Sequence, residues 1–245
     1  MKEWISGRNP VLETLKAGRR TFFQLKLARG LEEQGRVDEI KALAFKKKIP
    51  LGVVDRTELN HLAENHQGVA LQVGDYPYID VAEMLDLAQT RDEPPFILIL
   101  DVLQDPQNFG TLIRSAAAFG VYGIIIPFHR AVGITPAVVH ASSGASEHLL
   151  IAQSNLAQAI EALKQNNVWV VGLESSAEAQ DIATMDLRGA LALVVGSEGQ
   201  GLRELTRKSC DYLARLPMTG RMESLNAAVA GSIALFLAFS ARLKK

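Results

Sequence analysis

The first segment whose residues suit chemistry runs from Asp101 to Arg114 and leads from a loop into a predicted helix. Arg114 follows Asn108 by six residues, on the first or second turn that we expect, and its sequence neighbours are mostly apolar. A guanidinium in such surroundings can hold a phosphate through two parallel hydrogen bonds. The alternative interpretation is a capped helix that carries an ordinary surface arginine.

A second segment, Gly196–Leu202, follows a late apolar run and contains Gly196, Gly199 and Gly201. Glycines let the main chain approach a ligand closely, and a following helix offers free N–H groups. The glycine order differs from the G-x-G-x-x-G fingerprint, which disfavours an NAD-dependent oxidoreductase. Glu198 in this segment is either a carboxylate at a helix N-terminus or a functional group.

The third segment, Arg215–Asn226, is a polar loop that leads into a long apolar helix. Ser224 and Asn226 are typical helix caps, and each taken alone is explained that way. The three segments together indicate a binding site more strongly than any one of them.

Short runs of apolar residues precede these segments and would form the strands that position them. The runs cover residues 96–100, 122–126, 168–171 and 191–195, and predicted helices at 112–119, 156–165 and 202–208 separate them. Such runs suit strands buried on both faces of a parallel sheet. We therefore predict an α/β fold, a mostly parallel sheet with helices on both faces and ligand at the carboxyl ends of its strands.

The front of the chain has a different pattern. Residues 1–76 predict a small α/β domain with strands at 21–28, 51–54 and 69–73. Two prolines close a polar stretch before the first apolar run, so we assign residues 77–95 to a linker and 96–245 to the second domain.

Composition narrows the class of protein. Apolar residues make up 48% and charged residues 22% of the 245-residue chain, as in folded globular domains. The net charge of −1 conceals an asymmetry: residues 1–50 hold 12 Lys and Arg against 6 Asp and Glu, a net of +6. The basic front of the chain suits either a solvated face or an RNA surface.

The single cysteine, Cys210, excludes an internal disulfide and multi-cysteine metal sites, and it suits a cytoplasmic protein. The first ten residues, MKEWISGRNP, do not have the apolar pattern of a secretory signal, so we expect none. The uncharged stretch 227–239 has 13 residues, whereas a membrane span needs roughly 20, so we expect no membrane insertion.

The three segments, DPQNFGTLIRSAAAFGV, LVVGSEGQGL and LPMTGRMESLNAAVAGSIALF, together resemble the motifs of the SpoU (TrmH-like) branch of the SPOUT RNA methyltransferases. The front motifs ISGRNPVLETL and HQGVALQV are similar to the RNA-binding domain of the RlmB-type group. The resemblance covers nearly the whole chain.

This resemblance implies transfer of a methyl group from S-adenosylmethionine to a ribose 2′-hydroxyl, with a guanosine of 23S rRNA as the expected target. It also implies a C-terminal trefoil knot and a homodimer formed through the last helix. Because the sulfonium already activates the methyl group, no metal is expected, and alignment of the hydroxyl can supply roughly 7–11 kcal/mol.

The residues that match the family's functional positions are then assigned by motif. The expected catalytic residues are Arg114, Asn108, Glu198, Ser224 and Asn226. The expected cofactor-binding residues are Gly172, Val195, Gly196, Glu198, Gly199, Gly201, Leu216, Met218, Ser224, Leu225 and Asn226. The expected RNA-binding residues are Arg8, Arg19, Arg20, Lys26, Arg29, Lys46, Lys47 and Lys48.

Two further interpretations stay open. One is a tRNA 2′-O-methyltransferase of the same superfamily, and the other is an RNA-binding protein without turnover. Arg114 serves in these expectations as a phosphate clamp rather than as a base, because a guanidinium keeps its proton at working pH.

Overall fold

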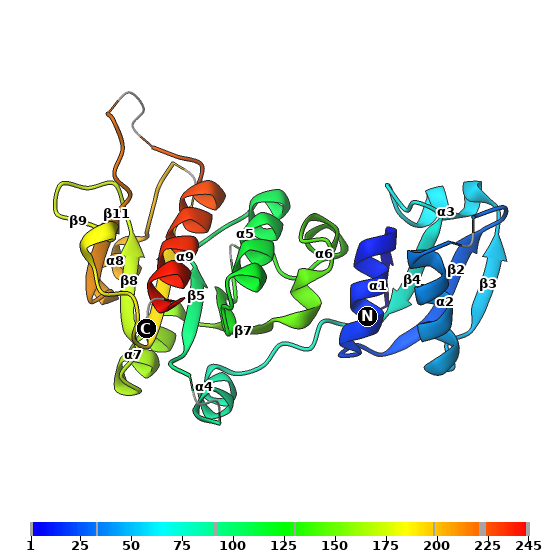
Figure 1. Ribbon diagram of the computed structural model, residues 1–245, viewed down its shortest axis with the longest axis horizontal. Coiled ribbons are helices and arrows are strands. Elements are labelled where there is room, and N and C mark those ends of the chain that lie inside the picture. Colours follow the sequence, from blue (N-terminus) through cyan, green and yellow to red (C-terminus); the bar gives the residue numbers. More distant parts are fainter. Residues whose placement is uncertain are drawn as a thin grey trace. The chain divides into compact units, whose positions relative to one another are not determined.

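The computed structural model describes residues 2–32, 34–90, 93–129, 131–197, 199–220 and 224–243. The chain forms two compact units (Figure 1). The first unit comprises Met1–Pro77 and Ile134–His148, and the second comprises Tyr78–Gly133 and Leu149–Lys245. Residues 134–148, which the sequence placed in the second domain, therefore fold with the N-terminal residues. The expected linker, residues 77–95, is also corrected: from Tyr78 on it belongs to the second unit, because Met84 and Leu85 pack in that unit's core.

The first unit is built on a four-stranded sheet in the order β1-β4-β2-β3. Its strands are β1 (Glu3–Ser6), β2 (Phe22–Ala28), β3 (Leu51–Val54) and β4 (Val69–Val73). Its helices are α1 (Arg8–Ala17), α2 (Arg36–Lys46), α3 (Arg56–Leu62), α6 (Pro136–Ala141) and a 3-10 turn, Ala145–His148. The three expected strands are confirmed, whereas the sequence did not predict β1, because its residues, EWIS, form neither an alternating pattern nor a continuous apolar run.

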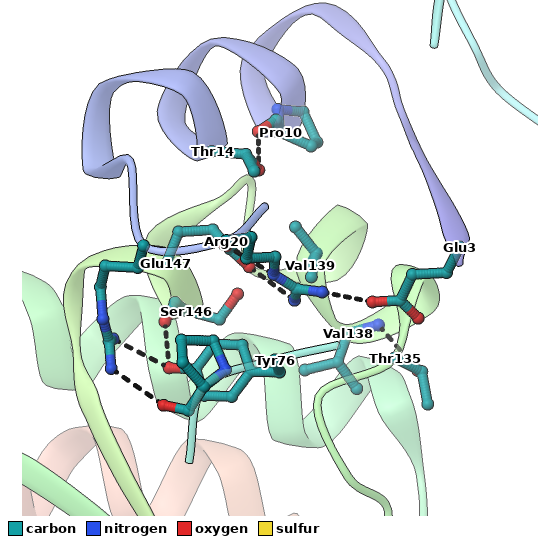
Figure 2. A network of polar contacts seen from close by, with 12 residues as sticks. Glu3, Pro10, Thr14, Arg20, Tyr76, Thr135, Val138, Val139, Ser146 and Glu147 are labelled. Carbon is teal, nitrogen blue, oxygen red and sulfur yellow. Dashed lines mark hydrogen bonds and ion pairs between the residues drawn. The ribbon is translucent and has the colours of Figure 1, made fainter. Parts of the chain in front are cut away.

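A buried ion network joins the two pieces of this unit (Figure 2). Arg20 donates to both carboxylate oxygens of Glu147, at 2.9 and 2.8 Å, and also pairs with Glu3. The side chains of Arg20 and Glu147 are fully buried. Tyr76 adds a 2.8 Å hydrogen bond from its hydroxyl to the carbonyl oxygen of Ser146.

This network corrects one of the RNA-binding expectations. Burial by itself lowers the pKa of Arg20, but the hydrogen bonds and charges of Glu147 and Glu3 outweigh it, and the net pKa is raised. A fully buried guanidinium that is saturated by two carboxylates cannot contact a phosphate. Arg20 therefore belongs to the core and not to an RNA surface.

The second unit contains a seven-stranded sheet in the order β7-β6-β5-β10-β8-β11-β9, and all its paired strands are parallel. The strands are β5 (Phe96–Leu100), β6 (Gly123–Pro127), β7 (Leu150–Ser154), β8 (Trp169–Leu173), β9 (Gln180–Asp181), β10 (Leu191–Val195) and β11 (Tyr212–Arg215). The helices are α4 (Val81–Gln89), α5 (Pro106–Ala118), α7 (Leu156–Gln165), α8 (Glu204–Ser209) and α9 (Ala227–Leu243), with a 3-10 turn at Ile182–Thr184.

The four apolar runs are confirmed as β5, β6, β8 and β10, and the parallel sheet is confirmed with them. The sequence missed β7, β9 and β11. Polar residues interrupt β7 and β11, and β9 has only two residues, so none of them forms a continuous apolar run.

Helices cover both faces of this sheet. Successive strand residues point to opposite faces, and Ala192 and Val194 pack with α4 and α7 residues such as Met84 and Ile160. On the opposite face α5 and α9 lie side by side (Figure 1). A Cβ on Gly231 would lie 2.5 Å from Leu112 Cδ2 and 3.1 Å from Val195 Cγ2, so α9 packs closely on α5 and β10 because residue 231 is glycine.

No helix within the described residues is long and apolar enough to cross a membrane.

Candidate active site

A cavity of about 330 Å³ lies at the carboxyl ends of β8, β10 and β11. This is the edge at which a parallel sheet places its ligands. The cavity is lined by Leu173, Glu174, Ser175, Val195, Gly196, Ser197, Gly199, Gln200, Gly201, Leu202, Ala214, Arg215, Leu216, Met218, Ser224, Leu225, Ala227 and Ala230. The second and third polar segments of the sequence therefore meet at one cavity.

Eight expected cofactor residues line this cavity: Val195, Gly196, Gly199, Gly201, Leu216, Met218, Ser224 and Leu225. Gly172 is not among the residues that line the cavity. A Cβ on Gly172 would lie 2.7 Å from Leu202 Cδ1 and 3.0 Å from Cys210 Sγ, so the residue faces the packed core. The following residues, Leu173–Ser175, reach the cavity instead. Glu198 lies outside the described residues.

The glycine segment folds back on itself beside the cavity. Ser197 and Gly201 exchange two main-chain hydrogen bonds, of 3.0 and 3.1 Å. A Cβ on Gly196 would lie 2.3 Å from the carbonyl carbon of Gly201 and 2.6 Å from the nitrogen of Leu202. Those atoms belong to the main chain and cannot rotate away. Only glycine at position 196 allows the loop to close in this way.

Asp101 anchors the other end of the loop. Its carboxylate is fully buried at the end of β5 and accepts hydrogen bonds from the main-chain nitrogen of Arg203 at 2.9 Å and from Arg203 Nε at 2.6 Å. The next residue, Val102, has a φ of 60°, a strained value for a β-branched residue. The role of Asp101 is not among the expectations drawn from the sequence, although a carboxylate directly after a buried strand is a usable signal.

Asn226 links the first and third polar segments. Its side-chain oxygen accepts from the main-chain nitrogens of Ala228 at 2.9 Å and Val229 at 3.1 Å, so it caps α9. Its amide donates to Asn108 Oδ1 at 3.1 Å. Asp105 caps α5 through the main-chain nitrogens of residues 107 and 108. Asn226 therefore caps α9 and contacts the first turn of α5, but it is not among the residues that line the cavity.

Arg114 lies in the third turn of α5, one turn later than we expected, because the helix begins at Pro106. The side chain is exposed and makes no hydrogen bond or ion pair with the residues that the structure describes. It does not line the cavity. The structure leaves this guanidinium exposed, and it brings two other expected catalytic residues, Asn108 and Asn226, into direct contact.

One charged residue of the cavity, Glu174, is paired. Arg207 bonds Glu178 at 2.5 Å and Glu174, a cavity residue, at 2.8 Å, and these hydrogen bonds raise its pKa. Burial, with the charge of Asp211, raises the pKa of Cys210 to about 12. The thiol is therefore protonated at neutral pH and is not a nucleophile.

The basic residues of the first unit that we expected to bind RNA form a partly buried group and an exposed group. The partly buried group contains Arg19 and Lys26. Arg19 donates to the Tyr76 hydroxyl and the Pro77 carbonyl, both at 3.2 Å, and Lys26 pairs with Glu58 at 2.6 Å. The exposed group contains Arg29 and residues 46–48, while Arg8 is half-buried and donates to the Gln67 carbonyl at 3.3 Å.

Two models of known protein families match the chain, one over each of its two parts. Residues 95–236 match the model of the SpoU rRNA Methylase family, and residues 4–79 match the model for RNA 2′-O ribose methyltransferase substrate binding. A TrmH family tRNA/rRNA methyltransferase of Bacillus subtilis is 40% identical, covering 98% of this chain and 96% of its own.

Two more similar proteins add to these matches. The 23S rRNA (guanosine-2′-O-)-methyltransferase RlmB of Pseudomonas putida is 37% identical, covering 99% of this chain and 98% of its own. The crystal structure of an AdoMet-bound rRNA methyltransferase from Sinorhizobium meliloti superimposes with a TM-score of 0.80 at 26% identity, covering 97% of this chain and 86% of that one.

Proposed function

The chain belongs to the SpoU methylase family of S-adenosylmethionine-dependent RNA methyltransferases, and from that premise we propose that it methylates a ribose 2′-hydroxyl of a guanosine in 23S rRNA. The observation that carries the proposal is the cavity at the strand ends, where the motif loops meet. The Pseudomonas putida relative, similar over almost its whole length, supports the choice of substrate. Ribosomal RNA is cytoplasmic, so we propose that the protein acts there.

The cavity residues fit S-adenosylmethionine. Adenine and the methionine part need an apolar slot with main-chain donors and acceptors. Leu173, Leu202 and Leu216 supply apolar surface, and the glycine loop supplies main chain without side chains in the way. When bound, the cofactor supplies a methyl group that its positive sulfur activates for attack.

The chain itself must position the nucleophile. We assign to Arg114 the phosphate beside the target ribose, because its guanidinium is exposed and can form two parallel hydrogen bonds. Asn108, Ser224 and Asn226 would fix the loops and the ribose, and the observed bond from Asn226 to Asn108 ties two of them together. The 2′-hydroxyl proton would pass to the phosphate or to water, with Glu198 as the second candidate acceptor.

Arg114→Lys tests the clamp. The variant keeps the charge and loses the planar fork, so we expect a loss of about 100-fold in kcat, since misplacing a reacting group by an ångström costs that much. Single-turnover methyl transfer, with the affinity for S-adenosylmethionine measured alongside, checks this. The cofactor affinity should stay within twofold, and activity near that of the unchanged chain would contradict the clamp.

The first unit would hold the RNA. We keep Arg8, Arg29 and residues 46–48 as the proposed phosphate contacts, with Arg19 and Lys26 at partly buried positions beside them. Arg20 is removed from the set because it is buried.

The last helix supports the proposed homodimer. An apolar stripe runs along the uncharged stretch of α9, formed by four exposed residues at helical spacing: Val229, Ile233, Phe236 and Leu243.

Replacing Ile233 by aspartate should convert the dimer into a monomer, because a charge would be buried in the contact. Analytical ultracentrifugation at micromolar concentration checks this, with Leu87→Asp, another exposed leucine, as the control. An unchanged mass for Ile233→Asp would exclude this face.

The trefoil knot is part of the same proposal. β10 lies between β5 and β8, and α9 returns from β11 to pack against β10 and α5. Such a return of the chain end across earlier strands is what a knotted carboxyl end requires.

The decisive experiment is methyl transfer to 23S rRNA and to tRNA from a strain that lacks the gene, with the product nucleoside identified. We expect 2′-O-methylguanosine in 23S rRNA. Methylation of tRNA alone would replace the proposed substrate by the alternative one, and binding of RNA without turnover would leave a non-catalytic protein.

A further inference from the structure

A second cavity, of about 390 Å³, lies in the second unit at the carboxyl ends of β6 and β7. Phe128 and His129 follow β6, Ser154 ends β7, and Arg203, Leu205 and Thr206 come from the start of α8. None of these residues belongs to the expected site. The size is within the range of small-molecule pockets, which usually combine apolar walls with a few polar groups.

This cavity shares a chain segment with the cofactor cavity. Leu202 lines the first cavity and the next residue, Arg203, lines the second. Asp101 holds this segment, because its buried carboxylate accepts from both Nε and the main-chain nitrogen of Arg203. A ligand in the second cavity therefore lies one residue along the chain from the loop that borders the cofactor.

The guanidinium of Arg203 is held at one end only. Asp101 engages Nε at 2.6 Å, while Nη1 and Nη2 form no bond with the residues that the structure describes. A guanidinium anchored in this way has lost much of its freedom before a ligand arrives, so the N–H donors of two nitrogens, Nη1 and Nη2, remain in a restricted position for an anion.

Two large apolar side chains lie at the rim of the same cavity. Phe128 is 60% exposed and Leu205 is 65% exposed. An exposed aromatic ring beside a fixed guanidinium is the combination that binds a nucleotide, since bases stack on aromatic faces and phosphates accept from arginine. The hydroxyls of Ser154 and Thr206 can form hydrogen bonds with the polar edge of a base.

We propose that this second cavity binds a nucleotide of the RNA substrate other than the methylated one, with its base on the Phe128 ring and its phosphate on Nη1 and Nη2 of Arg203. The inference rests on the proposed function, because it takes RNA as the substrate. It adds a contact in the second unit that selects and positions the RNA, while the basic residues of the first unit bind its backbone.

Phe128→Ala is the primary test, because the ring is mostly exposed and its removal should leave the fold intact. We expect the dissociation constant for a 23S rRNA fragment to rise about 5- to 100-fold, the effect of losing one base stack, and kcat/KM to fall equally. The affinity for S-adenosylmethionine should stay within twofold. Trp169→Ala is the matched control, since Trp169 is 56% exposed but starts β8, at the opposite end of the parallel strands.

Arg203→Gln gives an independent readout. Losing one phosphate contact should lower the slope of log affinity against log salt concentration by about 0.7 to 1. Guanosine monophosphate added in excess distinguishes a cavity that binds a nucleotide within RNA from one that binds a free nucleotide. We expect guanosine monophosphate to compete only weakly with the RNA fragment, because it lacks the backbone contacts of the first unit.

Photocrosslinking with 4-thiouridine-substituted RNA should yield adducts on the peptides that contain Phe128 or Arg203. Wild-type RNA affinity in both Phe128→Ala and Arg203→Gln, with no adduct on either peptide, would overturn the inference. If the unchanged chain methylates no RNA at all, the proposed function itself fails, so the two failures are distinguishable.

Discussion

Gly196→Ala is expected to weaken binding of S-adenosylmethionine by at least about 100-fold, equivalent to about 2.7 kcal/mol. The new Cβ would lie 2.3 Å from the carbonyl carbon of Gly201 and 2.4 Å from its oxygen. Main-chain atoms cannot turn aside as a side chain can, so the loop from Ser197 to Leu202 must open. Isothermal titration calorimetry with S-adenosylmethionine measures the change directly.

Gly189→Ala is the matched control for this variant. Gly189 is an exposed glycine in the same unit, and a Cβ placed on it meets no atom within 4 Å. It should bind the cofactor like the unchanged chain. Full cofactor affinity in Gly196→Ala would show that the glycine loop does not border the bound cofactor, and the proposed site would then be wrong.

Glu147→Ala is expected to destabilise the first unit by roughly 3–5 kcal/mol, because it leaves the Arg20 charge buried without its main partner. Glu3 pairs with the same guanidinium but is partly exposed, so it compensates only in part. Urea unfolding followed by circular dichroism checks this value. We expect this loss of stability because residue 147 folds with residues 1–77, although it lies 70 or more residues away along the chain.

Two further variants make this test specific. Arg29→Ala removes an exposed pair with Asp55, at 3.6 Å, and should change stability by less than about 1 kcal/mol. The double variant Arg20→Met with Glu147→Leu removes both buried charges and should recover most of the stability, since apolar residues of similar volume replace buried ion pairs well. A small loss for Glu147→Ala would mean that residues 134–148 are not an integral part of the first unit.

The same network explains why a domain boundary drawn from the sequence is incomplete. The composition changes after residue 76, and that change is real, but Glu147 and Ser146 cover Arg20 and Tyr76 from sequence that lies beyond the first strands of the second unit. A chain cut at residue 76 would leave these groups uncovered. Composition and periodicity register only neighbours in the chain, so they could not reveal a contact between residues 20 and 147.

The sequence by itself determined the parallel sheet, because short continuous apolar runs separated by helices are typical of strands buried on both faces. It also indicated the loops in which we propose that the cofactor lies. It also indicated Asn226 as the cap of α9, since capping depends on residues within one turn. Tertiary structure alone decided the pairing of Asp101 with Arg203, the burial of Arg20, the inward packing of Gly172 and the existence of a second cavity. Each of these depends on which distant segments meet, and local residue preferences do not encode distance across the fold.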